Sequence, residues 1–157
     1  MKALVKSEND LHLIDVPVPV PQRGEVLIKI KYAGLCHSDL YIIHGKAGLR
    51  TKFPVILGHE FSGVVVDGDS LWIGQRVCAE TTIATCGRCA CCCTGRRNLC
   101  SQRDIIGYVY PGCFAEYIAI PTGNLHKIPN NLTFQEAVLW EPLACVVHGF
   151  EIAPCFD

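Results

Sequence analysis

The chain has 157 residues, of which 50% are hydrophobic and 18% charged, and its formal net charge is −1 at pH 7. This composition excludes a disordered chain and predicts one globular domain, or one large lobe of a larger protein. Since the chain has neither a basic stripe nor a long apolar run, we expect no nucleic-acid partner and no membrane span. The first residues, 1–6, are too few and too charged for a signal peptide, so we expect a cytoplasmic protein.

Most of the chain has the composition of β-strands. The first predicted strand, residues 11–16, leads into three prolines at alternate positions, which favour an extended connection. In the second, residues 25–32, apolar and charged residues partly alternate, as in a half-buried strand. The third ends at the turn signal Asp67-Gly68-Asp69, and Pro121 closes the fourth. The predicted strands cover residues 11–16, 25–32, 60–66 and 114–120.

A helical region is predicted near the end of the chain, over residues 133–152. Thr133 and Glu136 have the spacing of a capping box. We expect a helix to about Trp140, an interruption at Pro142, and a second helix that is apolar almost all round, over residues 143–150. This order of elements predicts a mainly β fold: a short-stranded barrel or half-barrel with a metal-stapled excursion and a C-terminal helix.

The excursion is a cysteine-rich lobe at residues 86–100. Four of its cysteines are separated by two, two and seven residues, a spacing that lets a looping segment present four sulfurs to one tetrahedral ion. They are Cys86, Cys89, Cys92 and Cys100. Zinc is the first expectation, because it suits four thiolates.

Two alternatives for the lobe stay open, with less support. Disulfides are disfavoured in a chain without an export signal. An iron–sulfur cluster commonly takes its fourth cysteine after three residues and then a proline. Here Cys100 follows Cys92 after seven residues, and Ser101 comes next.

A second candidate set combines Cys36, His59 and one carboxylate, from Glu60 or Glu141. Catalytic zinc sites commonly use three protein ligands and leave one position open. Taken singly, each residue is a weak signal, because a lone buried cysteine is usually a small hydrophobe. The contrast with the all-cysteine lobe predicts one closed structural site and one open catalytic site.

These motifs also carry a family resemblance over nearly the whole chain. It runs through Gly34–Asp39, Gly58–Gly63, Gly74–Val77, the cysteine lobe, Phe114–Tyr117 and Glu141–Leu143. The chain resembles the N-terminal catalytic domain of the medium-chain zinc-dependent alcohol dehydrogenases, especially the sorbitol, butanediol and threonine dehydrogenase branch. The resemblance implies a GroES-like β barrel that occupies residues 1–157 as one domain.

The resemblance implies two zinc ions per chain. It implies Cys36 and His59 as ligands of the catalytic zinc, with Glu60 as a direct or exchanging ligand. Glu141 matches a position that supplies a further ligand or a carboxylate bonded to the zinc water, and Cys145 is the fallback ligand. The four lobe cysteines would hold the structural zinc.

Two further residues have roles that the resemblance implies. Ser38 matches the hydroxyl residue that passes the substrate proton outward, and Asp39 matches the carboxylate that orients the zinc-bound imidazole. The implied reaction is oxidation of a small secondary alcohol or polyol, by zinc-assisted alkoxide formation and hydride transfer to NAD or NADP. The resemblance also implies a homo-oligomer for the complete enzyme.

The chain departs from the family in several places. It contains no Gly-x-Gly-x-x-Gly loop, so we expect the nucleotide-binding Rossmann domain to be absent from this chain. An inactive zinc-binding fragment is therefore the second hypothesis, and an iron–sulfur electron carrier is the third. Tyr41 stands where many relatives have a histidine, and Cys113 where a second glycine is typical.

Overall fold

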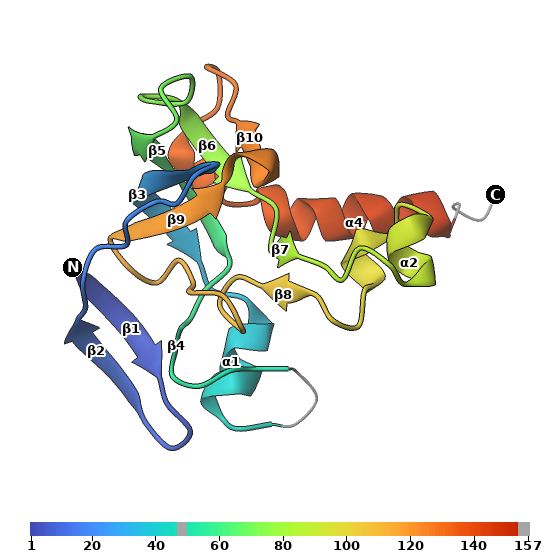
Figure 1. Cartoon of the computed structure of the whole chain (residues 1–157), viewed down its shortest axis with the longest axis horizontal. Helices are drawn as coiled ribbons and strands as arrows, with labels where there is room; N and C mark the ends of the chain where they lie inside the picture. The colour runs from blue at the N-terminus through green and yellow to red at the C-terminus, as the bar shows by residue number, and fades with distance from the viewer. Residues whose placement is uncertain (47–49, 154–157) are drawn as a thin grey trace.

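A computed structural model of the chain describes residues 1–46 and 50–153 (Figure 1). The strands are β1 (Lys2–Lys6), β2 (Leu11–Asp15), β3 (Glu25–Gly34), β4 (Val55–Ile56), β5 (Glu60–Gly68), β6 (Arg76–Ala79), β7 (Thr82–Ala84), β8 (Asp104–Ile105), β9 (Tyr117–Pro121) and β10 (Leu125–Lys127). The helices are α1 (His37–Ile43), α2 (Ala90–Cys93), α3 (Phe134–Ala137) and α4 (Trp140–Ile152), with 3₁₀ turns η1 (Arg97–Leu99) and η2 (Thr122–Asn124). The fold is mainly β and ends in a helix, as the sequence predicts.

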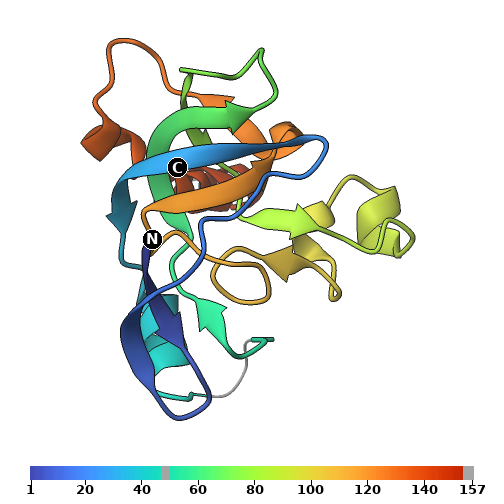
Figure 2. The same cartoon turned by 60° about the vertical axis from the view of Figure 1, so that its left-hand side comes forward.

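The body of the molecule is a five-stranded antiparallel sheet in the order β10-β6-β5-β3-β9. The register of β3 on β5 shifts between Leu27 and Ile28 and again between Ile30 and Tyr32. Such irregularities bend a strand and increase its twist. The sheet therefore curls into a half-barrel, which Figure 2 shows from the side.

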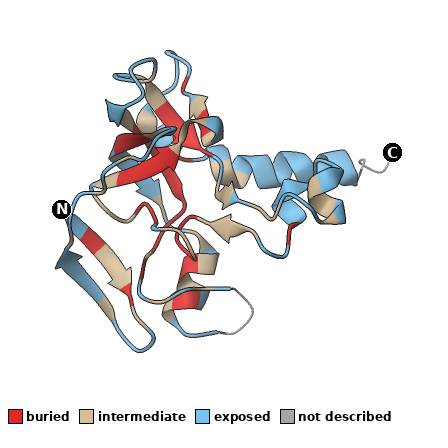
Figure 3. Cartoon of the chain, viewed as in Figure 1, coloured by how far each residue is buried: buried red, intermediate tan, exposed pale blue. Residues whose placement is uncertain are grey.

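The core is built on this sheet, whose strands carry many of the buried residues, red in Figure 3. Its members are mostly β-branched or aromatic residues that suit a pleated, half-buried surface. The buried ones come from all five strands and include Val26, Ile28, Val65, Val77, Ile118 and Ile120. Because apolar burial is the main favourable term in folding, this cluster is the principal source of stability of the half-barrel.

Ile28 provides a direct test of that core. Its side chain is completely buried, so Ile28→Ala removes several methyl and methylene groups and leaves a cavity. We expect the free energy of unfolding to fall by about 2–5 kcal/mol. Urea unfolding measures it, with Leu13→Ala as the control, because Leu13 is 67% exposed. Equal losses in the two variants would contradict this placement of the core.

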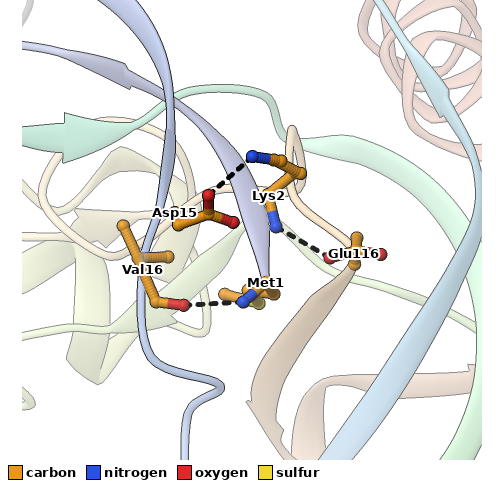
Figure 4. Close-up of polar contacts among 5 residues, drawn as sticks. All are labelled: Met1, Lys2, Asp15, Val16 and Glu116. Carbon is orange, nitrogen blue, oxygen red and sulfur yellow. Dashed lines mark hydrogen bonds and ion pairs between the residues drawn. The ribbon is translucent and has the colours of Figure 1, made fainter.

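A second sheet, in the order β2-β1-β4, extends the molecule at the N-terminal end. The Met1 ammonium donates to the Val16 carbonyl at 2.8 Å, and the Lys2 backbone N–H donates to the Glu116 carboxylate at 2.7 Å (Figure 4). A bridge between Ala3 and Ala115 adds a backbone connection. The first strand is thereby tied to the segment that enters β9.

The four predicted strands are present with shifted ends. β2 ends at Asp15, whereas β3 and β5 extend beyond the predicted ends to Gly34 and Gly68. The prediction that the fourth strand starts at Phe114 was wrong, since β9 starts at Tyr117. The Phe114 N–H instead donates to the Leu57 carbonyl, outside the sheet, at 2.8 Å.

The two C-terminal helices separate earlier than predicted. The expected interruption at Pro142 was wrong, because α3 ends at Ala137 and α4 begins at Trp140. Pro142 lies in the first turn of α4, where a backbone N–H has no acceptor within the helix. The predicted capping box is confirmed: Thr133 Oγ1 accepts from the Glu136 N–H at 3.1 Å, and the Glu136 carboxylate accepts from the Thr133 N–H at 2.7 Å.

Helix α4 lies along one side of the half-barrel and reaches past it toward the cysteine lobe (Figure 1). Its apolar residues remain largely exposed, for instance Leu143, Val146 and Phe150. No helix among residues 1–46 and 50–153 is both long enough and apolar enough to span a bilayer.

Candidate functional site

A clamp of backbone hydrogen bonds positions the segment that precedes β5. The N–H groups of residues 112, 113 and 114 donate to the carbonyls of residues 56, 58 and 57, at 2.8 to 2.9 Å. Gly58 has φ +89°, and a Cβ there would lie 2.5 Å from the Phe114 ring. Only glycine allows this conformation and this close approach. The clamp therefore fixes the direction in which the next residue, His59, leaves the segment.

Cys36, His59 and Glu60 form a compact group, with one potential ligand atom from each lying within 4.8 Å of the others. His59 immediately precedes β5, Glu60 is the first residue of β5, and Cys36 is the N-cap of α1. The Glu60 carboxylate packs directly over Gly34, where a Cβ would collide with it. The structure thus brings together three of the four residues that the sequence predicts for an open site.

Asp39 connects two members of this group. Its side chain is fully buried; Oδ2 accepts from the Cys36 N–H at 3.0 Å, and Oδ1 lies 3.4 Å from His59 Nδ1. Among the described residues, Oδ1 and Nδ1 have no aligned hydrogen-bond partner. Burial opposes the charged imidazolium, but Asp39 and then Cys36 outweigh it and raise the pKa of His59 to about 9. The contact directs Nδ1 toward Asp39 and leaves Nε2 as a donor for a metal ion, an arrangement common for metal-bound histidines.

Replacing Asp39 with asparagine tests this connection. The asparagine side chain would keep the size of the carboxylate but lose the negative charge that orients and polarises His59. We expect the affinity for zinc at this group to fall about 10–100-fold, measured by competition with a chromophoric chelator. Asp10→Asn, at an exposed carboxylate, is the control. An unchanged zinc affinity in Asp39→Asn would show that the carboxylate only caps α1.

Glu141, the fourth predicted residue, lies outside the compact group. It is in the first turn of α4. Burial raises the pKa of Glu141, the charge of His59 acts in the opposite direction, and Glu60 and Asp39 add to the rise. Its carboxylate also accepts a weak hydrogen bond from the Cys145 thiol at 3.8 Å. The charges of His59, Glu60 and Asp39 therefore act on Glu141, although its carboxylate is not one of the ligand atoms of the compact group.

Ser38 lies half-buried in the first turn of α1, and Tyr108 lies beside the compact group, although no sequence motif predicted it. Burial raises the pKa of the Tyr108 phenol, and the Ser38 side chain acts in the opposite direction. The Tyr108 ring also meets the His59 imidazole edge to face, with centroids 5.6 Å apart. An isolated aromatic residue usually belongs to a core, so no sequence signal distinguished Tyr108.

The cysteine lobe brings its four predicted thiols together. Their sulfurs all lie within 4.8 Å of one another, and the separations include 3.5 Å for Cys89–Cys92, 3.6 Å for Cys86–Cys100 and 3.9 Å for Cys86–Cys92. Backbone N–H groups of residues 88 and 89 lower the pKa of Cys86 to about 6, which favours the thiolate that metals bind. The neighbours Cys91 and Cys93 are free thiols outside this group.

A cavity of about 390 Å³ lies between α4 and the lobe. Its lining residues carry hydroxyl, imidazole, guanidinium and carboxylate groups, and they include Thr82, Arg97, His126, Trp140, Glu141 and His148. Through Glu141 the cavity adjoins the surroundings of the compact group. Its size is in the range of small-molecule sites.

Comparison with known proteins supplies the family context. Residues 22–130 match the family described as the alcohol dehydrogenase GroES-like domain. The chain is 40% identical to the sorbitol dehydrogenase of Halalkalibacterium halodurans, over 95% of the chain and 45% of that protein. It is also 40% identical to the L-threonine 3-dehydrogenase of Bacillus subtilis, over 94% of the chain and 45% of that protein.

The fold has an equally clear counterpart among solved structures. A protein of Sinorhizobium meliloti 1021, classed as a zinc-binding dehydrogenase and bound to NADP, superposes with a TM-score of 0.90 at 34% identity. The match covers 98% of the chain but 45% of that structure. The chain thus spans about 45% of the length of the relatives it matches.

Proposed function

Because the chain belongs to the alcohol dehydrogenase GroES-like domain family, we propose that it is the catalytic domain of a zinc-dependent dehydrogenase. Its reaction is oxidation of a small secondary alcohol or polyol, with hydride transfer to NAD or NADP. The observation that carries the proposal is the compact group of Cys36, His59 and Glu60. The similar sorbitol and threonine dehydrogenases support the substrate class.

The donor atoms of both groups suit zinc. A thiolate, an imidazole and a carboxylate are its usual protein ligands, and three of them leave a position open for water or substrate. Zinc bound there supplies a Lewis acid that lowers the pKa of an alcohol hydroxyl. Four thiolates make a closed, structural set. We therefore assign two zinc ions per chain, with Cys36, His59 and Glu60 at one and the four lobe cysteines at the other.

The remaining residues handle the proton and the orientation of ligands. Asp39 holds His59 in one ring orientation through its contact at 3.4 Å. Ser38, half-buried in the first turn of α1, relays the proton that leaves the alcohol hydroxyl outward, releasing its own hydrogen toward solvent as it accepts that proton. Glu141 supplies a negative charge at the edge of the site, as a further ligand or as an acceptor for a water molecule.

Two broader assignments belong to the same proposal. The described cysteines are free thiols, and closely spaced free thiols persist in a reducing compartment, which supports the cytoplasm. We also assign a homo-oligomeric state to the complete enzyme, in line with the family.

Metal analysis and ligand binding test the proposal together. We expect about two zinc ions per purified chain, and after cobalt substitution a change in the visible spectrum when a secondary alcohol is added. Iron in place of zinc would assign an electron carrier instead. Zinc binding without any spectral response of the cobalt protein to an alcohol would assign a zinc-binding fragment without turnover.

A further inference from the structure

We infer that Cys113 is a positioning residue for the compact group: its thiol and its backbone N–H hold the chain on both sides of His59. The inference rests on the proposed function, because it concerns two of the ligands assigned to the open zinc site. The Cys113 sulfur is not among the ligand atoms of the compact group. Cys113 therefore acts through His59 and Glu60.

Cys113 makes two hydrogen bonds to the segment that carries these ligands. Its N–H donates to the Gly58 carbonyl at 2.9 Å, and its thiol donates to the Glu60 carbonyl at 3.4 Å. These carbonyls belong to the residue before His59 and the residue after it. A glycine at position 113 would keep the first bond and lack the second, so the side chain of Cys113 supplies a restraint of its own.

Burial fixes the place of the thiol. Cys113 is 1% exposed and belongs to the same core cluster as Phe61 and Ile106. A Cβ at the neighbouring Gly112 would lie 2.2 Å from the Leu57 carbonyl oxygen, so only glycine allows the two segments to approach so closely. Because the contact between the thiol and the Glu60 carbonyl is buried, water cannot replace this hydrogen bond when it is lost.

The bond acts where the sheet gives least support. Glu60 pairs with Gly34 in the last pair of the ladder between β5 and β3, and His59 precedes the strand. Residues at the end of an element open more readily than those inside it. A metal site requires its ligands to be held in place by the residues around them. The Cys113 thiol provides such support at the first residue of β5.

Metal binding tests the inference without turnover. Cys113→Ala keeps the backbone bond to Gly58 and removes the donor to Glu60. Cobalt is titrated into the chain after metal removal, in the presence of 2,3-butanediol. The diol-dependent bands report the compact group alone, because the four ligands of the lobe leave no open position. We expect these bands to shift and the dissociation constant of cobalt to rise about fivefold, the equivalent of one hydrogen bond.

Three further variants separate positioning from packing. Cys113→Ser keeps a hydrogen-bond donor and is expected to match the parent chain, whereas Cys113→Val, which fills the space without a donor, is expected to match Cys113→Ala. Cys78→Ala is the matched control, because the Cys78 thiol is also buried and donates to the His126 carbonyl, at 3.8 Å. We expect it to lower the thermal midpoint as Cys113→Ala does and to leave the cobalt bands unchanged.

The outcomes distinguish this inference from the function on which it rests. Cobalt binding like that of the parent chain in Cys113→Ala and Cys113→Val, or an equal change in Cys78→Ala, would overturn the inference alone. A Cys113→Ser chain that behaves like Cys113→Val would do the same, since the donor would then be irrelevant. Absence of any diol-dependent band in the parent chain would overturn the proposed function as well.

Discussion

His59→Ala is expected to remove about one zinc ion per chain and leave the other in place. His59 is 5% exposed, and its imidazole is the only nitrogen ligand of the compact group, whose other members are a thiolate and a carboxylate. Without it, Cys36 and Glu60 remain as two donors, too few to hold the ion against dilution. The expected result is a zinc content of about half that of the parent chain, together with loss of the alcohol-dependent cobalt spectrum.

Plasma emission spectrometry of dialysed protein measures this change. His44→Ala is the matched control, because His44 is exposed at the end of α1. The thermal midpoint of both variants shows that the half-barrel is intact. If His59→Ala retained the full zinc content, Glu141 or Cys145 would have replaced the imidazole and the assigned ligand set would be wrong.

Cys100→Ser is expected to release the zinc ion of the lobe and to leave the ion of the compact group in place. Cys100 is completely buried, and its sulfur lies 3.6 Å from that of Cys86. Structural zinc sites contribute about 10–16 kcal/mol of binding free energy that is coupled to local folding. Loss of one thiolate therefore releases the lobe ion and unfolds residues 86–100, while the compact group keeps its own ion.

Limited proteolysis with trypsin detects this unfolding, because the lobe contains Arg88, Arg96 and Arg97. We expect cleavage within the lobe at least about tenfold faster than in the parent chain, since opening is no longer opposed by the metal. Cys93→Ser is the control, as this exposed thiol lies outside the group. Equal sensitivity of the two variants would mean that the lobe does not depend on a metal.

The sequence predicted the strands that carry alternating apolar residues, and it failed where tertiary contacts decide. β3 and β5 were found because their patterns are strong over many residues. Short strands such as β4 and β7 have two or three residues, too few for any period to be visible. Helix α1 was missed because it spans only seven residues and its N-cap is Cys36, an uncommon capping residue.

The candidate site likewise has residues that the sequence predicted and residues that it did not. The lobe cysteines were predictable because all four lie within one short, distinctive stretch. The compact group was only a weak prediction from the residues themselves, because Cys36 lies far from His59 and Glu60 in the chain, and the family resemblance supported it. Tyr108 could not be found, because its ring meets that of His59 only when the segment before β9 folds back over the one before β5.

The strand order has a consequence for how the chain is made. β3 pairs with β9, for instance Val26 with Ile120, so the half-barrel cannot close until the ribosome has synthesised the region beyond the lobe. The lobe thiols need only their own short loop, whose closure entropy is small. During translation the lobe is therefore complete before β9 and β10 are available to finish the sheet that β3, β5 and β6 begin.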